Sequence, residues 1–210
     1  PLVPPMVTLH IQGGRKEKIR PGDVLGALTA DLGYTREQVG KINVNEWSTY
    51  VAVDRNIAEQ VASRLNRLMA EEFGVEQYFT LIWAELDLAT GQVTLVQAGH
   101  PHPLILRAGG RVEVVGQGGF PIGLLPDADW HPVDFILNPG DRLLIPSDGL
   151  TECPGAEGEL GLSGLSRLLR RTADLDGRAA LAGIESALAA YAGAEFPDDL
   201  SAILFDRRAY

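Results

Sequence analysis

Two short stretches decide the fold of this chain: LLIPSDGLTE at residues 143–152 and PDDLSAILF at residues 197–205. Each joins an apolar strand to aspartate: Asp148 follows the first strand, and Asp198 and Asp199 precede the second. A rigid strand edge can hold a carboxylate against a divalent cation, because carboxylate oxygens are the ligands that Mg²⁺ prefers. The two stretches therefore indicate metal-assisted phosphoryl chemistry, whose further carboxylates are expected upstream.

The composition predicts a soluble, globular protein. The chain has 210 residues, of which 45% are hydrophobic and 22% charged, enough for one good core or two small ones. No stretch approaches the roughly 18 consecutive apolar residues of a membrane span, and the N-terminal PLVPP lacks the features of a signal peptide. The single cysteine, Cys153, excludes an intrachain disulfide. We therefore expect a cytoplasmic protein that does not interact with membranes.

The charge is distributed unevenly, which is the first sign of two origins. Residues 1–66 contain 8 Lys and Arg against 7 Asp and Glu, whereas residues 67–210 contain 10 against 21. All three lysines lie within the first 41 residues, so the rest of the chain uses only arginine for fixed positive charge. Two different sequence histories within one chain would explain this change.

The first third of the chain has the pattern of a β-α-β-β-α unit. Residues 6–11 alternate between apolar and polar side chains, as in a half-buried strand. Pro-Gly-Asp at residues 21–23 opens a predicted helix, and residues 39–44 and 49–53 are predicted strands. Asn56 is the predicted N-cap of a second helix. The closing strand of a split β-α-β sandwich is missing from this segment.

From about residue 78 the pattern changes to short apolar strands joined by tight turns, which indicates an antiparallel β layer. The predicted strands lie at residues 79–86, 93–98, 103–107, 112–115, 134–137, 142–146 and 200–205. Apolar periodicity predicts helices at residues 162–169 and 177–191.

Residues 65–206 resemble the C-terminal half of the SpoIIE/RsbU-type metal-dependent protein serine phosphatases. The resemblance depends on four motif blocks that occur in the order found in that family. The blocks are QYFT (77–80) with DLATG (87–91), AGHPHP (98–103), PIGL (121–124) followed by PGDRL (139–143), and SDG (147–149) with DDLS (198–201).

The resemblance implies a site and a reaction. In that family two Mn²⁺ or Mg²⁺ ions activate a water molecule that attacks a phosphoserine or phosphothreonine. By resemblance, Asp148 and Asp198 are metal ligands, and Asp199 lies beside them as a third catalytic residue. The implied partner is a phosphoprotein, such as an anti-sigma-factor antagonist.

Residues 6–66 resemble a different family, the RNA-binding domain of DbpA-type DEAD-box RNA helicases. The matching stretches are GGRKEKIRPGDVLGAL (13–28), VGKI (39–42) and YVAV (50–53). The likeness implies an RRM-like fold and ribosomal RNA as the ligand. The basic residues expected to contact RNA phosphates are Arg15, Lys16, Lys18, Arg20 and Lys41.

Each resemblance covers only part of a domain. The RNA-binding part ends at Asn66 without its last strand, and the phosphatase part begins there without the Gly-Asp-x-x-Asp and Asp-Val-x-Gly-x-Gly ligand motifs of the family. We interpret the chain as a recombined or engineered chimera, joined within the second helix, with a boundary between segments 1–66 and 67–210. The available carboxylates would then bind Mn²⁺ or Mg²⁺ only weakly.

The predicted fold class is α+β. An RRM-like β-α-β-β-α unit is followed by the antiparallel β layer and helices of a partial phosphatase-type α-β-β-α sandwich. An exposed sheet edge readily recruits a strand, so residues 78–86 are expected to fill the vacant place in the first sheet. The alternative is that these residues pair only within the phosphatase half.

Several motifs have a second interpretation. Gly22-Asp23-Val24-Leu25-Gly26 is similar to the phosphatase ligand turn, although the second glycine of that turn is absent. Asp148 alone could belong to an ordinary Asp-Gly turn. His100 and His102 have a spacing that can chelate zinc, but no third ligand is evident, so we favour histidines that bond to the backbone.

Three functional hypotheses follow from the sequence. The first is a phosphoprotein phosphatase module that is inactive because its upstream ligands are missing. The second is an RNA-binding module for a ribosomal RNA hairpin, and the third is a structural hybrid without either activity. Exchange of strands between chains could also produce a homodimer.

Overall fold

The computed structural model describes residues 5–208 except for residues 13, 17, 47, 73–77, 157, 194–195 and 197–198. The chain forms two compact units. The first consists of Pro1–Ala89, Val93–His100 and Gly118–Phe135, and the second of Thr90–Gln92, Pro101–Gln117 and Ile136–Tyr210. This division describes packing and not ancestry, so the boundary at residue 66 stays a prediction about origin.

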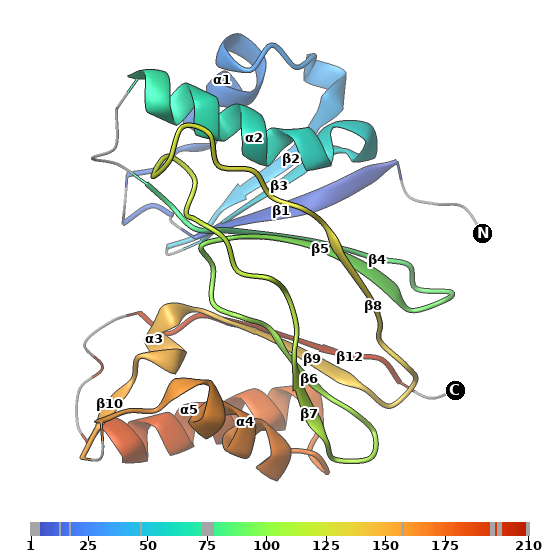
Figure 1. Cartoon of the computed structure of the whole chain (residues 1–210), viewed down its shortest axis with the longest axis vertical. Coiled ribbons are helices and arrows are strands. Elements are labelled where there is room, and N and C mark those ends of the chain that lie inside the picture. Colours follow the sequence, from blue (N-terminus) through green and yellow to red (C-terminus); the bar gives the residue numbers. More distant parts are fainter. Residues whose placement is uncertain are drawn as a thin grey trace. The chain divides into compact units, whose positions relative to one another are not determined.

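The first unit contains a six-stranded sheet with the strand order β2-β3-β1-β4-β5-β8. Figure 1 shows helices α1 and α2 on the same side of its N-terminal strands. The elements are β1 (Met6–Gln12), α1 (Pro21–Gly26), β2 (Val39–Val44), β3 (Ser48–Asp54), α2 (Arg55–Glu72), β4 (Leu81–Leu86), β5 (Gln92–Ala98) and β8 (Val133–Ile136).

Strand β4 fills the vacant place beside β1, as predicted. The two strands are antiparallel, and Leu9 lies opposite Trp83 while Ile11 lies opposite Leu81. The other edge of β4 pairs with β5, so the alternative that β4 pairs only within the phosphatase half is wrong. An ion pair between Arg55 at the start of α2 and Glu85 in β4 adds a second link between the N-terminal elements and this strand.

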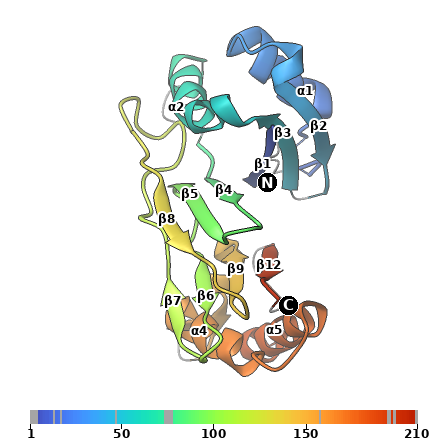
Figure 2. The same ribbon diagram turned by 90° about the vertical axis from the view of Figure 1, so that its right-hand side faces the viewer.

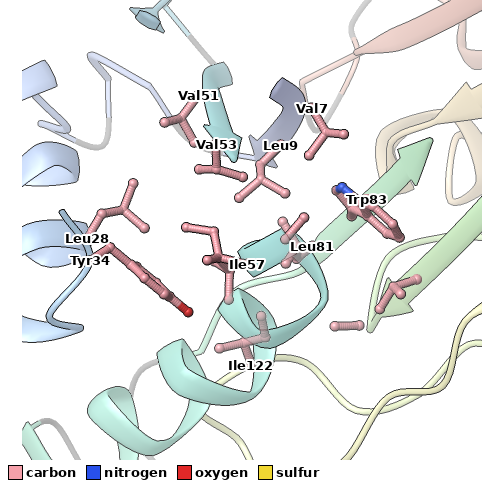
Figure 3. Packing of buried hydrophobic residues seen from close by; sticks show 14 of the residues in the cluster. Val7, Leu9, Leu28, Tyr34, Val51, Val53, Ile57, Leu81, Trp83 and Ile122 are labelled. Atoms are coloured by element: carbon pink, nitrogen blue, oxygen red, sulfur yellow. The ribbon is translucent and has the colours of Figure 1, made fainter. Parts of the chain in front are cut away.

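The core of the first unit lies between the sheet and its helices. Val7 and Leu9 of β1 and Val51 and Val53 of β3 are all at most 7% exposed. Figure 3 shows these side chains converging with Ile57 of α2 and with side chains from β4. The alternation seen in the sequence therefore has the expected cause, since every second side chain of β1 and β3 faces the core.

Two details of the N-terminal helices differ from the predictions. The first helix is not continuous, because α1 ends at Gly26 and residues Ala27–Asp31 form a π-helical turn. The prediction of Asn56 as an N-cap is wrong. Helix α2 begins at Arg55 directly after β3, and Asp54 Oδ1 accepts hydrogen bonds from the backbone N–H of Asn56 (2.8 Å) and from its Nδ2 (2.9 Å).

The second unit contains a four-stranded antiparallel sheet with the order β12-β9-β6-β7 and a hairpin of two short strands. Figure 2 shows α4 and α5 together on one side of this sheet. The elements are β6 (Leu104–Leu106), β7 (Val112–Val114), β9 (Arg142–Pro146), α3 (Asp148–Thr151), β10 (Pro154–Gly155), β11 (Gly158–Glu159), α4 (Gly161–Arg171), α5 (Gly177–Ala192) and β12 (Ala202–Asp206).

The core of the second unit is formed by alternate residues of its strands and by the apolar faces of its helices. Leu104 of β6 and Leu144 of β9 are fully buried and lie opposite each other. They pack with Leu165 of α4 and Leu188 of α5. Each unit thus consists of an antiparallel sheet with helices packed on one face, in agreement with the predicted fold class. Among the described residues, no helix is long and apolar enough to cross a membrane.

Candidate functional site

The turn after β9 is bonded to the segment that precedes β12, which brings the two decisive stretches of sequence together. The backbone N–H of Ser147 donates to the carbonyl oxygen of Ser201 (2.7 Å). In return, the backbone N–H of Ser201 donates to Ser147 Oγ (3.0 Å), and Ser147 Oγ donates to the carbonyl oxygen of Asp199 (3.3 Å). Ser147 is only 4% exposed, so these bonds are shielded from water.

Gly149 allows this close approach. A β-carbon at this position would lie 2.4 Å from the carbonyl oxygen of Asp199, so a larger residue would push the two segments apart. Asp148 begins the short helix α3, is partly exposed, and accepts a hydrogen bond from the backbone N–H of Gly149 through Oδ1 (3.0 Å). Asp199 is exposed. Asp198, the other predicted ligand, lies outside the described residues.

An apolar pocket of about 250 Å³ lies next to this turn. It is lined by Leu150 of α3, by Leu200 and Ser201 before β12, and by Ile184 and Leu188 of α5. The acidic turn therefore adjoins a concave apolar surface within the second unit.

The described residues do not provide a complete ligand set for a metal ion. No group of three or more His, Cys, Asp or Glu side chains occurs among them in a suitable arrangement. Asp23, the alternative candidate, accepts a hydrogen bond from the backbone N–H of Arg20 through Oδ2 (2.9 Å) and is exposed at the start of α1. It therefore acts in helix capping.

The two histidines of the AGHPHP motif have structural contacts. His102 Nδ1 lies 3.2 Å from the carbonyl oxygen of Val115. His100 is 5% exposed, and its carbonyl oxygen accepts a hydrogen bond from Gln97 Nε2 (2.5 Å). The preceding Gly99 has φ of 69°, and a β-carbon there would lie 2.6 Å from Pro121, so the motif needs glycine to make its turn.

The predicted RNA-contacting residues lie in the first unit and are all exposed; they are Arg15, Lys16, Lys18, Arg20 and Lys41. The loop that holds the first four is fixed to the turn between β2 and β3. The backbone N–H groups of Arg15 and Lys16 donate to the carbonyl oxygens of Asn45 (2.9 Å) and Glu46 (3.0 Å). Gly14 makes this contact possible, since a β-carbon would lie 2.5 Å from the carbonyl oxygen of Asn45.

Asp141 was not predicted as a key residue, although it belongs to the PGDRL motif. It is 3% exposed. Its Oδ1 accepts from the backbone N–H of Ala108 (2.9 Å), and its Oδ2 accepts from Arg107 Nη1 (2.7 Å) and from the backbone N–H of Asn138 (2.7 Å). Burial alone would raise the pKa of Asp141, but these hydrogen bonds outweigh burial and hold the pKa below its ordinary value.

Asn66 of α2 was also missed as a structural contact. Its side chain is 1% exposed and binds a loop about sixty residues away in the sequence. Nδ2 donates to the carbonyl oxygens of Leu125 (2.9 Å) and Pro126 (3.0 Å), and Oδ1 accepts from the backbone N–H of Gly123 (2.7 Å). Only the type of the residue, an asparagine on an apolar helix face, marks it in the sequence.

Two family models match the chain. Residues 44–208 match the family described as "Stage II sporulation protein E (SpoIIE)", and residues 8–73 match the "DbpA RNA binding domain". The phosphatase match begins earlier than the expected residue 65, and the RNA-binding match ends later than the expected residue 66. They overlap at residues 44–73, which include β3, Asp54 and α2.

Curated relatives show the same division. The chain is 50% identical over 60 residues to the ATP-dependent RNA helicase DbpA of Escherichia coli (strain K12), covering 29% of this chain and 13% of the helicase. It is 25% identical over 150 residues to the phosphoserine phosphatase RsbU of Bacillus subtilis (strain 168), covering 71% of this chain and 45% of that phosphatase. The chain thus spans less than half the length of either relative.

Solved structures match the whole fold. The RsbU and RsbW domains of Rv1364c from Mycobacterium tuberculosis align with 98% of this chain and 52% of that chain, with a TM-score of 0.67 and 20% identity. The Mn-presoaked phosphatase domain of the cell fate determinant SpoIIE from Bacillus subtilis aligns with 100% of this chain and 88% of that chain, with a TM-score of 0.56 and 19% identity. At these identities the comparison shows the fold alone: the N-terminal elements take part in a phosphatase-type sheet.

Proposed function

Because the chain belongs to the SpoIIE family, we propose that it is a phosphatase-type domain that does not hydrolyse phosphoproteins by itself. The observation that carries this proposal is that the sequence lacks the two upstream ligand motifs of the family. The sequence has no Gly-Asp-x-x-Asp motif. The stretch most similar to the second ligand motif is residues 22–26, and its aspartate, Asp23, caps helix α1. Asp148 and Asp198 are retained as the proposed remnants of the metal site, with Asp199 beside them.

Phosphatases of this family depend on Mn²⁺ or Mg²⁺, which would supply an activated water molecule when bound. The described donors do not fit such a centre, since it needs several carboxylates around each ion. A cation would be held only weakly by the three remaining aspartates, because Mg²⁺ retains its waters when oxygen ligands are few. These aspartates are Asp148, Asp198 and Asp199.

We expect no metal-dependent hydrolysis of p-nitrophenyl phosphate by the purified chain. The measurement compares the rate with and without Mn²⁺ for the unchanged chain and for Asp148→Asn, with circular dichroism to show that both are folded. The rates should agree within error, since the described residues offer no complete site that the substitution could remove. A Mn²⁺-dependent rate that disappears in Asp148→Asn would show that the domain is a working enzyme.

The partner of such a domain would be a phosphoprotein. The relative from Bacillus subtilis is a phosphoserine phosphatase, and by resemblance an anti-sigma-factor antagonist is the proposed kind of partner. The apolar pocket beside Asp148 offers a surface on which a side chain of such a partner could rest.

A second candidate function is RNA binding through the first unit, and the DbpA match favours it. The five cations of this candidate are exposed, and the loop that carries four of them is fixed by backbone hydrogen bonds and thus ordered before binding. The net charge of −10 for the whole chain opposes the approach of RNA. The third candidate, a chimera that retains the fold without either activity, is what remains if both tests fail.

If the first unit binds RNA, affinity for a ribosomal RNA hairpin should fall steeply with salt, because phosphate contacts release counterions. Lys16→Glu with Lys18→Glu should abolish the binding, while Arg36→Glu, an exposed reversal outside the candidate set, should weaken it much less. Fluorescence anisotropy at several salt concentrations measures both effects. Equal affinities for the two variants would argue against this RNA surface.

A further inference from the structure

A pocket of about 200 Å³ whose lining contains six charged side chains lies at the end of the second sheet, and none of its lining residues belongs to the turn that holds Asp148. The end of β6, the start of β9 and the end of β12 meet there. Its lining includes four arginines and two aspartates: Arg107, Arg142, Arg207, Arg208, Asp141 and Asp206. The formal charge of this lining is therefore about +2, within a chain whose net charge is −10.

Both aspartates are already engaged. Asp141 accepts hydrogen bonds from Arg107 and from two backbone N–H groups. Asp206 accepts from Arg142 Nε through Oδ1 (2.6 Å) and from Nη2 through Oδ2 (3.1 Å). Since each carboxylate is compensated by a guanidinium, the remaining positive charge comes from the two arginines at the end of β12.

Two of the guanidinium groups, those of Arg142 and Arg207, are held in place before any ligand arrives. Arg142 is 6% exposed, and its Nη1 and Nη2 also donate to the carbonyl oxygens of Thr172 (2.7 Å) and Leu175 (2.6 Å). Arg207 Nη1 donates to the carbonyl oxygens of Thr90 (2.7 Å) and Leu137 (2.5 Å). Arg208 is exposed, and its positive charge acts on the carboxylate of Asp176, the residue that precedes α5.

We propose that this pocket binds a small tetrahedral oxyanion of the phosphate class, with Arg208 as its principal ligand. A guanidinium matches two oxygens of such an anion and forms charge-assisted hydrogen bonds with them. Pockets for organic ligands usually measure about 300–1,000 Å³, so a pocket of this size suits an inorganic anion or a single phosphorylated side chain. The proposal does not depend on phosphatase activity.

The test is a titration of the full chain with inorganic phosphate by isothermal calorimetry, with sodium chloride adjusted to keep the ionic strength constant. We expect one saturable site whose affinity falls about tenfold in Arg208→Gln, the loss of one charge-assisted contact. Arg208→Lys should recover part of the affinity. Arg36→Gln removes the same charge from an exposed position of the first unit and should leave the affinity unchanged.

Asp148→Asn separates this site from the candidate phosphatase site. Phosphate binding that is unchanged in Asp148→Asn and weakened in Arg208→Gln supports the pocket. No saturable binding, equal affinities for Arg208→Gln and Arg36→Gln, or binding lost only in Asp148→Asn would overturn it. A phosphoserine peptide that competes with phosphate would identify the anion as part of a protein. A peptide that does not compete would identify the anion as the free ion. Either result supports the pocket, because phosphate must first bind there.

Discussion

Replacement of Asp141 by alanine is expected to destabilise the protein by about 3–5 kcal/mol, the cost of breaking a buried ion pair from one side. The carboxylate is 3% exposed and accepts three hydrogen bonds, from Arg107 and from the backbone N–H groups of Ala108 and Asn138. Without it, the backbone N–H groups of Ala108 and Asn138 lose their acceptor, and among the described residues Arg107 keeps Glu113 as its ionic partner. The free energy of unfolding in urea measures the effect.

A matched control is Asp174→Ala, which removes an exposed aspartate of the same unit and should change the free energy of unfolding by less than about 0.5 kcal/mol. Similar losses for the two variants would contradict the assigned role of Asp141.

The same carboxylate should make the stability depend on pH in the acid range. Because the folded state holds the pKa of Asp141 below its ordinary value, the native state favours the charged form. Its contribution is fully present above the unfolded pKa of about 3.9 and is lost as the pH falls through the lower, folded pKa. The difference in free energy of unfolding between the unchanged chain and Asp141→Asn should therefore shrink below about pH 4. A difference that stays constant down to pH 2 would mean that protonation of this group is not linked to folding.

The sequence was sufficient for those parts of the fold that depend on periodicity. The alternation in β1 predicted which side chains face the core. Alternate residues of a strand point to the same face, so Val7 and Leu9 are buried together. The place of β4 was predictable for a different reason: a unit that lacks its last strand leaves an open edge, and the next apolar strand in the chain is at hand to fill it.

Local signals misled the prediction at helix ends. Asn56 has the right chemistry for an N-cap, but Asp54 offers a carboxylate two residues earlier, directly at the end of β3. Either residue type can cap a helix, and only the point at which the strand ends decides between them. Residues 21–32 likewise have a continuous apolar face, which does not reveal the π-helical turn at Ala27–Asp31.

The candidate site was predictable where residues adjacent in the sequence determine the local backbone geometry by themselves. The Asp148-Gly149 turn is such a case, since the glycine is needed for the approach of Asp199. The role of Asp141 depends instead on Ala108 and Arg107, more than thirty residues away, and that of Arg142 on Asp206. Pairings of this kind follow from the strand order, which periodicity alone does not provide.

Replacement of Asn66 by alanine is expected to lower the free energy of unfolding by about 3 kcal/mol, since three hydrogen bonds of a buried side chain are lost at roughly 1 kcal/mol each. This residue lies within both matched families, and its partners all belong to residues 121–126, which only the phosphatase family includes. Asn66→Asp should be at least as harmful at neutral pH, because a carboxylate cannot donate to the carbonyl oxygens of Leu125 and Pro126.

The control for this prediction is Asn56→Ala, on the same helix, where the exposed side chain donates to Asp54. Its effect should stay well below 1 kcal/mol, and hydrogen exchange should speed up at residues 121–126 only in the Asn66 variants. If Asn66→Ala costs no more than Asn56→Ala, the reciprocal backbone hydrogen bonds between Phe79 and Ile122 are sufficient to hold that loop. Helix α2 would then contribute only apolar packing to the phosphatase-type part. Its contact with residues 121–126 would in that case be no argument that the helix and this part have the same origin.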